Sequence, residues 1–304
     1  MLRHNRSKSA NDVEFDLIGG LGNQLFIYFA SQYYTAKTGI NASLNLNTIG
    51  SGGTNHGRSI LDFDLPGKFI VSKKRNQFSI LARIIRKIRV KIPFLKKLCP
   101  QSSKTYVSDV LGFDPLLLEV RPGTSVHGYF QSWRYFENFL TKSNRPIKLV
   151  NPSEWYLDTL RLMNTINPIV IHIRMGDYQP LRETFGILSS GYYKYAIKSI
   201  DPHELSPIWV FSDDIDSARK ILTHGEISNT TYICPPTLTS PSESMMLMSH
   251  ADRIVIGNST FSWWAATLGN KDKTVIYPKP WFRNSEEPLG LFPSNWTPVE
   301  SSWW

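Results

Sequence analysis

Apolar residues in the second half of the chain form short runs that alternate with amphipathic stretches. The runs are rich in β-branched residues, which is typical of strands buried on both faces of a sheet. Strands that alternate with helices at this spacing predict right-handed βαβ units around a parallel sheet. The expected strands are 169–173, 208–211, 232–233, 253–257 and 274–277, and the expected helices are 192–200, 215–222, 242–249 and 261–268.

The first half of the chain carries weaker signals of the same kind. An apolar run at 15–18 leads into glycines, and residues 25–33 then show helical spacing, which predicts a strand, a tight turn and a helix. Residues 41–67 are rich in Asn, Gly and Ser and indicate a loop. A further strand is expected at 124–130, and a helix at 151–168.

Length and pattern together predict an α/β protein in two parts. A chain of 304 residues is longer than a usual single domain. The helix expected at 151–168 lies near the boundary, so we place an N-terminal domain at 1–155 and a C-terminal domain at 156–304. We expect the tail of the chain to return to the N-terminal domain.

Composition excludes several classes of protein. A content of 41% hydrophobic and 12% aromatic residues is too high for a disordered chain, which cannot bury enough apolar surface to fold. The two cysteines, Cys99 and Cys234, are too few for a disulfide scaffold and belong to no Cys/His metal motif. This usage is typical of a reducing compartment.

The net charge of +9 comes from one region of the chain. Residues 65–108 contain twelve Lys and Arg and no Asp or Glu, so the remaining residues sum to −3. Within the insert 68–104, apolar residues between 78 and 92 recur at helical spacing, with basic residues mostly on the other face. Such a helix is typical of attachment to an anionic membrane surface, although an ordinary surface helix docked on the core has the same pattern.

The sequence also predicts a cytoplasmic location. No segment approaches the ~20 consecutive apolar residues that span a bilayer. Residues 1–13 are polar and basic and lack the apolar centre of a signal peptide. Together with the basic block, these features predict a protein that is peripheral on the inner face of the cytoplasmic membrane.

Ligands of parallel α/β sheets bind beyond the carboxyl ends of the strands, close to helix N-termini. The first expected strand is followed by Gly-Gly-Leu-Gly-Asn-Gln at 19–24. Glycines there allow a tight turn and the close approach of a phosphate, which Gly22 and Asn23 would contact. A simple strand-to-helix turn is the alternative, because the segment lacks the GxGxxG spacing and the lysine of a Walker motif.

Three ionisable residues converge after the strand at 169–173. Alternation along the strand points His172 and Arg174 to the same side, and the chain turns at Gly176 before Asp177. Arginine offers a planar fork that suits a diphosphate, and a carboxylate beside it can accept a proton. The alternative is a structural salt bridge between Arg174 and Asp177 at the strand end.

Two further segments follow buried strands and begin helices. After 208–211 come Asp213 and the pair Asp214-x-Asp216, which matches a DxD metal site superficially. Ser212 or Asp213 as the N-cap, with acids in the first helical turn, would satisfy free N–H groups and oppose the helix dipole, and this favours capping over a metal. After 253–257, polar side chains beside a helix N-terminus favour an anion cradle, with a capped helix and core aromatics as the alternative. The cradle would consist of Asn258, Ser259, Thr260 and Phe261.

These segments, in this order, resemble glycosyltransferase family 11, the α-1,2-fucosyltransferases, in its bacterial form. The resemblance rests on GGLGNQLF at 19–26, HIRMGDY at 172–178, FSDD at 211–214 and NSTFSWW at 258–264. It spans residues 19–268 and includes Leu-Met-Ser at 247–249. The chain departs from the family where Met175 replaces a second basic residue and where Glu243 is followed by Ser244.

The resemblance implies a GT-B architecture, in which two Rossmann-like domains face a central cleft. It also implies GDP-L-fucose as the donor, transfer to the 2-hydroxyl of a galactose-type acceptor, inversion at the anomeric carbon, and neither a metal nor another cofactor. Arg174, supported by backbone N–H groups of residues 259–261, would neutralise the charge that builds on the leaving β-phosphate. Asp177 would be the base, and His172 would orient the donor or the base. Asn23 would reach the donor phosphate or the acceptor, and Asp213 would contact guanine or ribose unless it caps its helix.

The leading hypothesis is an inverting α-1,2-fucosyltransferase that extends a galactoside, free or lipid-linked, in a bacterial surface glycan such as O-antigen. Another GDP-sugar transferase with a different linkage is the second hypothesis. A non-catalytic basic protein that binds phosphate or nucleic acid through residues 65–108 is the third. We expect no nucleic-acid partner, because the strand-end motifs lie outside that block and no RRM, KH or helix-turn-helix signature occurs.

Overall fold

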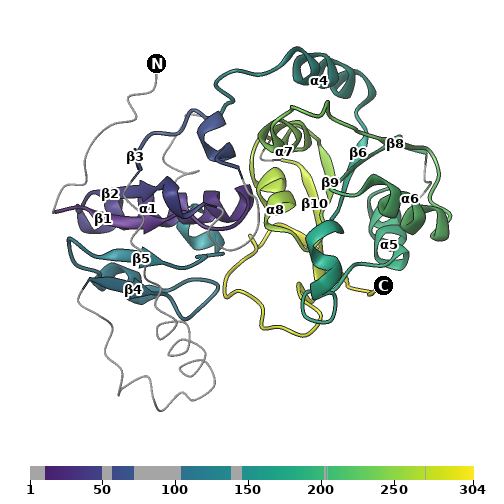
Figure 1. Cartoon of the computed structure of the whole chain (residues 1–304). Helices are drawn as coiled ribbons and strands as arrows, with labels where there is room; N and C mark the ends of the chain where they lie inside the picture. Colours follow the sequence, from purple (N-terminus) through teal and green to yellow (C-terminus); the bar gives the residue numbers. More distant parts are fainter. Residues whose placement is uncertain are drawn as a thin grey trace. The chain divides into compact units, whose positions relative to one another are not determined.

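The computed structural model describes residues 11–49, 57–71, 104–137, 146–201, 203, 205–270 and 272–304. The chain divides into two compact units (Figure 1). The first comprises Met1–Arg58, Pro66–Asn144 and Pro288–Leu291, and the second comprises Ser59–Leu65, Arg145–Glu287 and Phe292–Trp304.

The units differ from the two domains that the sequence suggested. The main division falls between residues 144 and 145 and not between 155 and 156, and each unit takes in a short segment from the other half of the chain. Only residues 288–291 of the C-terminal region join the first unit, whereas 292–304 belong to the second. The amphipathic helix expected at 78–92 lies outside the described residues, and the membrane attachment inferred from it stays a prediction.

The first unit is built on a five-stranded parallel sheet of order β3-β2-β1-β5-β4. One long helix, α1 (Leu21–Thr38), contacts β1 and β2 and buries Phe26 and Phe29. It ends at Gly39, whose left-handed φ of 73° glycine adopts without strain. The strands are β1 (Val13–Asp16), β2 (Ala42–Asn45), β3 (Lys68–Ile70), β4 (Thr105–Val107) and β5 (Ser125–His127).

The prediction of one loop over residues 41–67 is wrong. β2 lies within this range, together with the 3₁₀ helices η1 (Leu46–Thr48) and η2 (Ser59–Asp62). Two further 3₁₀ helices, η4 (Pro115–Glu119) and η5 (Trp133–Tyr135), flank β5. Short elements of three to five residues leave no periodicity that can be recognised among Asn, Gly and Ser.

The predicted order of strand, glycine turn and helix at the start of the first unit is confirmed, but the strand bounds of 15–18 are wrong, because β1 spans Val13–Asp16. Its apolar residues alternate with Glu14 and Asp16, so only one face of the strand is apolar and no continuous run marks it. Glu14 is nevertheless buried, and its carboxylate accepts a hydrogen bond from the Asn45 amide at 2.9 Å. This contact supplies a partner that a buried carboxylate requires.

The second unit is built on a six-stranded parallel sheet of order β11-β10-β9-β6-β7-β8. Counted along this unit the order is 6-5-4-1-2-3, which is that of a Rossmann fold. Helices α5 and α6 lie on one side of the sheet, and α7 and α8 on the other (Figure 1). The strands are β6 (Ile169–Ile173), β7 (Ile208–Ser212), β8 (Thr230–Tyr232), β9 (Arg253–Val255), β10 (Thr274–Lys279) and β11 (Thr297–Glu300).

The prediction of an α/β fold with two Rossmann-like parts is confirmed. β6 has the bounds expected from its unbroken apolar run, whereas β11 was not expected because Val299 is its one buried residue. Besides η2, the described helices of the second unit are α4 (Glu154–Ile166), the 3₁₀ helix η6 (Gly176–Leu181), α5 (Ser190–Ile200), α6 (Ile215–His224), α7 (Pro241–Ser249) and α8 (Thr260–Thr267). Among the described residues, every helix is too short or too polar to cross a membrane.

A buried lysine joins the C-terminal ends of α7 and α8. The Lys273 ammonium donates to the backbone carbonyls of Ser249 at 2.5 Å, Leu268 at 2.6 Å and Ala265 at 3.4 Å. The position suits a cation because the last carbonyls of a helix have no partner within the helix. Burial lowers the pKa of Lys273 to about 7.

Candidate active site

The strand order of the second sheet reverses between β6 and β9, which are hydrogen-bonded neighbours. Ligands of such sheets bind at this switch point, beyond the carboxyl ends of the two strands. Arg174 follows β6 directly, and Gly257 follows β9. A Cβ on Gly257 would lie 3.0 Å from the carbonyl oxygen of His172, so glycine lets the two chain segments approach closely.

Arg174 is held between two carboxylates. Its Nε and Nη2 both contact Oδ1 of Asp177, at 2.9 and 2.7 Å, and its Nη1 lies 3.3 Å from Oδ2 of Asp213. Burial alone would lower the pKa of Arg174, but Asp213 and Asp177 outweigh it and raise the pKa above its ordinary value. The guanidinium is therefore permanently charged and fixed in orientation. Three of its five N–H donors face carboxylates, and two remain for a ligand.

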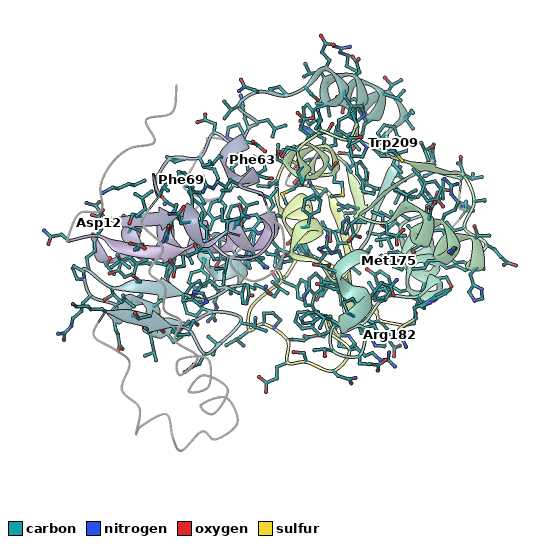
Figure 2. The ribbon with its side chains drawn as sticks, in the orientation of Figure 1. Asp12, Phe63, Phe69, Met175, Arg182 and Trp209 are labelled. Atoms are coloured by element: carbon teal, nitrogen blue, oxygen red, sulfur yellow. The ribbon has the colours of Figure 1, made fainter. Side chains whose placement is uncertain are left out.

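Asp213 anchors the turn that carries Arg174. Its Oδ1 accepts the backbone N–H of Met175 at 2.9 Å, and a Cβ on Gly176 would lie 2.7 Å from its Oδ2. Figure 2 labels Met175, at the start of this turn, and Arg182, at the end of η6. The sequence suggested that Asp213 contacts guanine or ribose or caps its helix, whereas in the structure its two oxygens are used by Met175 and Arg174.

Asp214, not Asp213, caps the next helix. Its Oδ1 accepts the backbone N–H of Ser217 at 3.0 Å, at the start of α6. These hydrogen bonds from Ser217 lower the pKa of Asp214. The prediction of a capped helix at this segment is therefore confirmed, but the N-cap is Asp214 and neither Ser212 nor Asp213, which the sequence suggested. Within the described part of the chain, no three His, Cys, Asp or Glu side chains gather as ligands for a metal ion.

His172 lies inside the second unit beside the site. It is 3% exposed, its ring centroid is 5.6 Å from that of Phe261, and its Nδ1 has no hydrogen-bond partner among the described residues. Burial, followed by the positive charge of Arg174, lowers the pKa of His172 to about 3. The imidazole is therefore neutral at pH 7, and it can position a neighbouring group but cannot supply a positive charge.

Side chains of the expected anion cradle are engaged in hydrogen bonds within the protein. Asn258 donates from Nδ2 to the carbonyl oxygens of Phe185 at 2.8 Å and Gly186 at 3.2 Å. Ser259 caps α8, because its Oγ accepts the N–H of Phe261 at 3.3 Å. Asn258 and Ser259 thus shape the site, while Thr260 begins α8 at its edge.

A tyrosine that the sequence did not single out links these parts. The hydroxyl of Tyr178 donates to the carbonyl oxygen of Asn258 at 2.9 Å, and its ring lies 5.7 Å from the Arg174 guanidinium carbon. Burial raises the pKa of Tyr178, so the hydroxyl stays protonated and continues to donate. Tyr178 therefore joins the end of β6 to the end of β9.

The segment that follows η6 is braced by the end of the chain. Gly186 has a φ of 81° and packs against the indole of Trp303, where a side chain would collide with the ring. Ser189 N–H donates to the Ser302 carbonyl at 2.8 Å, and Trp304 N–H donates to the Ile187 carbonyl at 2.7 Å. Since Gly186 also accepts from Asn258, residues 302–304 support the wall of the site.

The first unit has its own switch point, between β1 and β5. Gly19 turns the chain with a φ of 73°, and the helix that follows places Gly22 in its first turn and Asn23 next to it. The Gln131 amide donates to Oδ1 of Asn23 at 3.0 Å, and the Gln24 amide donates to the carbonyl of Gly19 at 3.0 Å. The second acceptor of the Gln24 amide is the carbonyl of Gly57, at 3.1 Å.

Sequence reasoning missed both glutamines of this amide cluster. Gln24 and Gln131 are buried, and their Oε1 atoms have no hydrogen-bond partner among the described residues. In the same unit, His127 Nδ1 lies 3.6 Å from Oδ2 of Asp16. The available signal was position, since Gln131 follows the end of β5 by four residues as Asp177 follows β6.

The structure thus brings the predicted residues together in two separate groups. Gly22 and Asn23 belong to the switch point of the first unit. The rest gather at the switch point of the second unit: His172, Arg174, Asp177, Asp213, Asn258, Ser259, Thr260 and Phe261.

Comparison with known proteins places the chain in a family. The model of Glycosyl transferase family 11 matches residues 126–299. An alpha-1,2-colitosyltransferase of Escherichia coli is 31% identical over 301 residues, which cover 93% of this chain and 97% of the relative. The O-antigen biosynthesis glycosyltransferase WbnK of Escherichia coli is 28% identical, covering 89% of this chain and 95% of the relative. A crystal structure of NodZ alpha-1,6-fucosyltransferase soaked with GDP-fucose aligns with a TM-score of 0.47 and 14% identity, covering 85% of this chain and 93% of that one.

The comparisons define the class of the protein, a glycosyltransferase. The chain belongs to glycosyl transferase family 11. The family resemblance drawn from the four motifs is therefore confirmed.

Proposed function

We propose that the protein is an inverting α-1,2-fucosyltransferase. It moves L-fucose from GDP-β-L-fucose to the 2-hydroxyl of a galactose-type residue in a bacterial O-antigen or a similar glycan. The observation that carries the proposal is the Arg174 guanidinium, fixed by Asp177 and Asp213 at the switch point of a Rossmann sheet. The relatives support the product class, since one is named for an α-1,2 linkage and the other for O-antigen biosynthesis.

The proposed reaction is a single displacement. The acceptor 2-hydroxyl oxygen attacks the anomeric carbon of fucose while the bond from that carbon to the β-phosphate oxygen breaks, which inverts the configuration. The hydroxyl proton passes to a base, for which we propose Asp177, and the bonding electrons leave with GDP. Negative charge thus builds on the β-phosphate, and Arg174 stabilises it more strongly in the transition state than in the ground state. The guanidinium takes the part that a metal ion plays in other transferases, so the proposal includes no metal or other cofactor.

A second candidate is the transfer of colitose, the 3-deoxy counterpart of L-fucose, from GDP-colitose. The observation in its favour is the 31% identity with an alpha-1,2-colitosyltransferase. A site that hydrogen-bonds the 3-hydroxyl of fucose leaves a polar group unpaired when colitose binds. The two donors are therefore distinguishable by their rates.

The test supplies the purified protein with GDP-L-fucose or GDP-colitose and a panel of galactosides, and determines the product linkage by NMR. We expect fucose on O2 of galactose, with kcat/KM at least about tenfold higher than for colitose. Faster transfer of colitose would replace the proposal with the second candidate. Transfer of a different GDP-sugar, with neither of these two accepted, would refute both.

A further inference from the structure

The two carboxylates that contact Arg174 differ in how firmly the rest of the protein fixes them. Asp213 is 26% exposed, and it also accepts the Met175 N–H at 2.9 Å, so the backbone anchors it. Asp177 is 43% exposed and contacts Arg174 through Oδ1, at the first turn of η6. Moving Asp177 away from Arg174 therefore costs less free energy than moving Asp213.

The net charge around Arg174 disfavours a diphosphate while both carboxylates contact the guanidinium. One guanidinium and two carboxylates carry a net charge of −1. An approaching phosphate is therefore repelled by Asp177 while that side chain stays on Arg174. Carboxylate and phosphate oxygens use the same donor fork of arginine. The edge of Arg174 formed by Nε and Nη2 presents that fork, and Asp177 now occupies it.

We propose that Asp177 occupies the phosphate position on Arg174 until the diphosphate of the donor displaces it. This inference rests on the proposed function and adds an order of events to it. A carboxylate that has left the guanidinium has its oxygens free to accept the proton of the acceptor hydroxyl, so donor binding produces the base that the transfer step uses. The acceptor hydroxyl is then deprotonated only when a donor is in place.

Asp177→Asn separates this exchange from a purely structural ion pair, because the two predict opposite changes in GDP affinity. Removing the competing charge should tighten GDP binding about tenfold, measured by isothermal titration calorimetry. The transfer rate should fall at the same time, because the base is lost. If Asp177 only orients Arg174, the substitution should instead weaken GDP binding.

The matched control is Glu183→Gln. It removes the same charge from an exposed carboxylate six residues along the same segment, which pairs with Arg182 and Arg283 and not with Arg174. GDP affinity in this variant should stay within about twofold of wild type, because exposed charges at a distance are screened by solvent and salt. Equal tightening by both variants would overturn the exchange.

Inorganic pyrophosphate is the second probe, since it tests the phosphate position without guanine or sugar. Tighter pyrophosphate binding by Asp177→Asn supports the exchange even if the donor proves not to be GDP-fucose, so the two proposals can fail separately. Asp177→Ala repeats the measurement if the Asn variant does not fold. Unchanged or weaker binding of both probes by a folded variant would overturn the exchange.

Discussion

The two switch points of the molecule present different chemistry. In the second unit charge dominates, because Arg174 lies between Asp177 and Asp213 at the end of β6. In the first unit amides dominate, because Gln131 donates to Asn23 where β1 and β5 lead into their loops. Both sites stand at the same place in a parallel sheet, yet they offer a ligand different groups.

The difference separates two kinds of recognition. A guanidinium fixed by carboxylates offers donors and a positive charge, which suit a phosphate. Amide groups offer one donor and one acceptor side without charge, which suit sugar hydroxyls. Under the proposed function, the second unit therefore binds the GDP part of the donor, and the first unit binds hydroxyls of a sugar.

The largest expected effect comes from removing the guanidinium of the charged site. Arg174→Ala should lower kcat/KM about 10³-fold, since one preorganised donor to a developing oxyanion is already worth ~10²–10³-fold. Asp214→Ala is the matched control and should stay within about fivefold, because Asp214 serves the N-terminus of α6. Steady-state kinetics with both variants measure the contrast, and equal losses would contradict the roles assigned here.

The second prediction concerns the stability of the unit that carries the charged site. Burial lowers the pKa of Lys273 to about 7, whereas the unfolded chain has the ordinary value near 10.4. At pH 9 the unfolded chain still binds more protons at this lysine than the folded one, so the free energy of unfolding should rise from pH 7 to pH 9, below the range in which the tyrosines of the unfolded chain titrate. We expect a gain of ~1–2 kcal/mol, because the three carbonyl oxygens restore part of the hydration that the ammonium loses.

Urea unfolding at pH 7 and pH 9 measures this gain. Lys273→Met should abolish the difference between the two pH values, and Lys198→Met, on the exposed side of α5, should preserve it. The same pH dependence in wild type and Lys273→Met would show that other groups cause it.

The third prediction addresses the amide site. Gln131→Leu should raise the KM of the galactoside acceptor ~3–10-fold, which is the value of one lost hydrogen bond to a hydroxyl. GDP affinity should not change, because the amide contributes no charge. Gln32→Leu removes the same group from a position further along α1 and should leave both values unaltered. A loss of GDP affinity in Gln131→Leu would remove the distinction between the two sites.

The smallest expected effect concerns metal ions. Treatment with EDTA should leave the transfer rate within about twofold of the untreated enzyme, because Arg174 supplies the charge that stabilises the leaving GDP. Added Mn²⁺ should not increase the rate. Loss of activity with EDTA and recovery with Mn²⁺ would show that the guanidinium does not act alone.

Patterns local to the sequence predicted the second unit well. β6 is buried throughout, and the four motifs each lie at the end of a strand, so the switch-point rule predicted the position of Arg174 and Asp177. A capped helix was also predicted after β7, although with Ser212 or Asp213 as the N-cap and not Asp214. Local chemistry is sufficient where a strand is buried on both faces.

Contacts between distant parts of the chain were not predictable in this way. The start of β1 was not recognisable from the pattern, because Glu14 interrupts its apolar residues. Glu14 is buried with a hydrogen bond from Asn45, 31 residues away. The Gln131 partner, Asn23, is 108 residues away, and no spacing in a single sequence reveals such a pair. Trp303 became part of the wall of the site through Gly186 for the same reason.

The most direct test of the central claim is a crystal structure of the protein with GDP bound. The account predicts a β-phosphate oxygen on Nε and Nη2 of Arg174, with Asp177 moved away from the guanidinium and Asp213 still on Met175. GDP bound elsewhere in the molecule, or bound with Arg174 and Asp177 still paired as they are now, would contradict it.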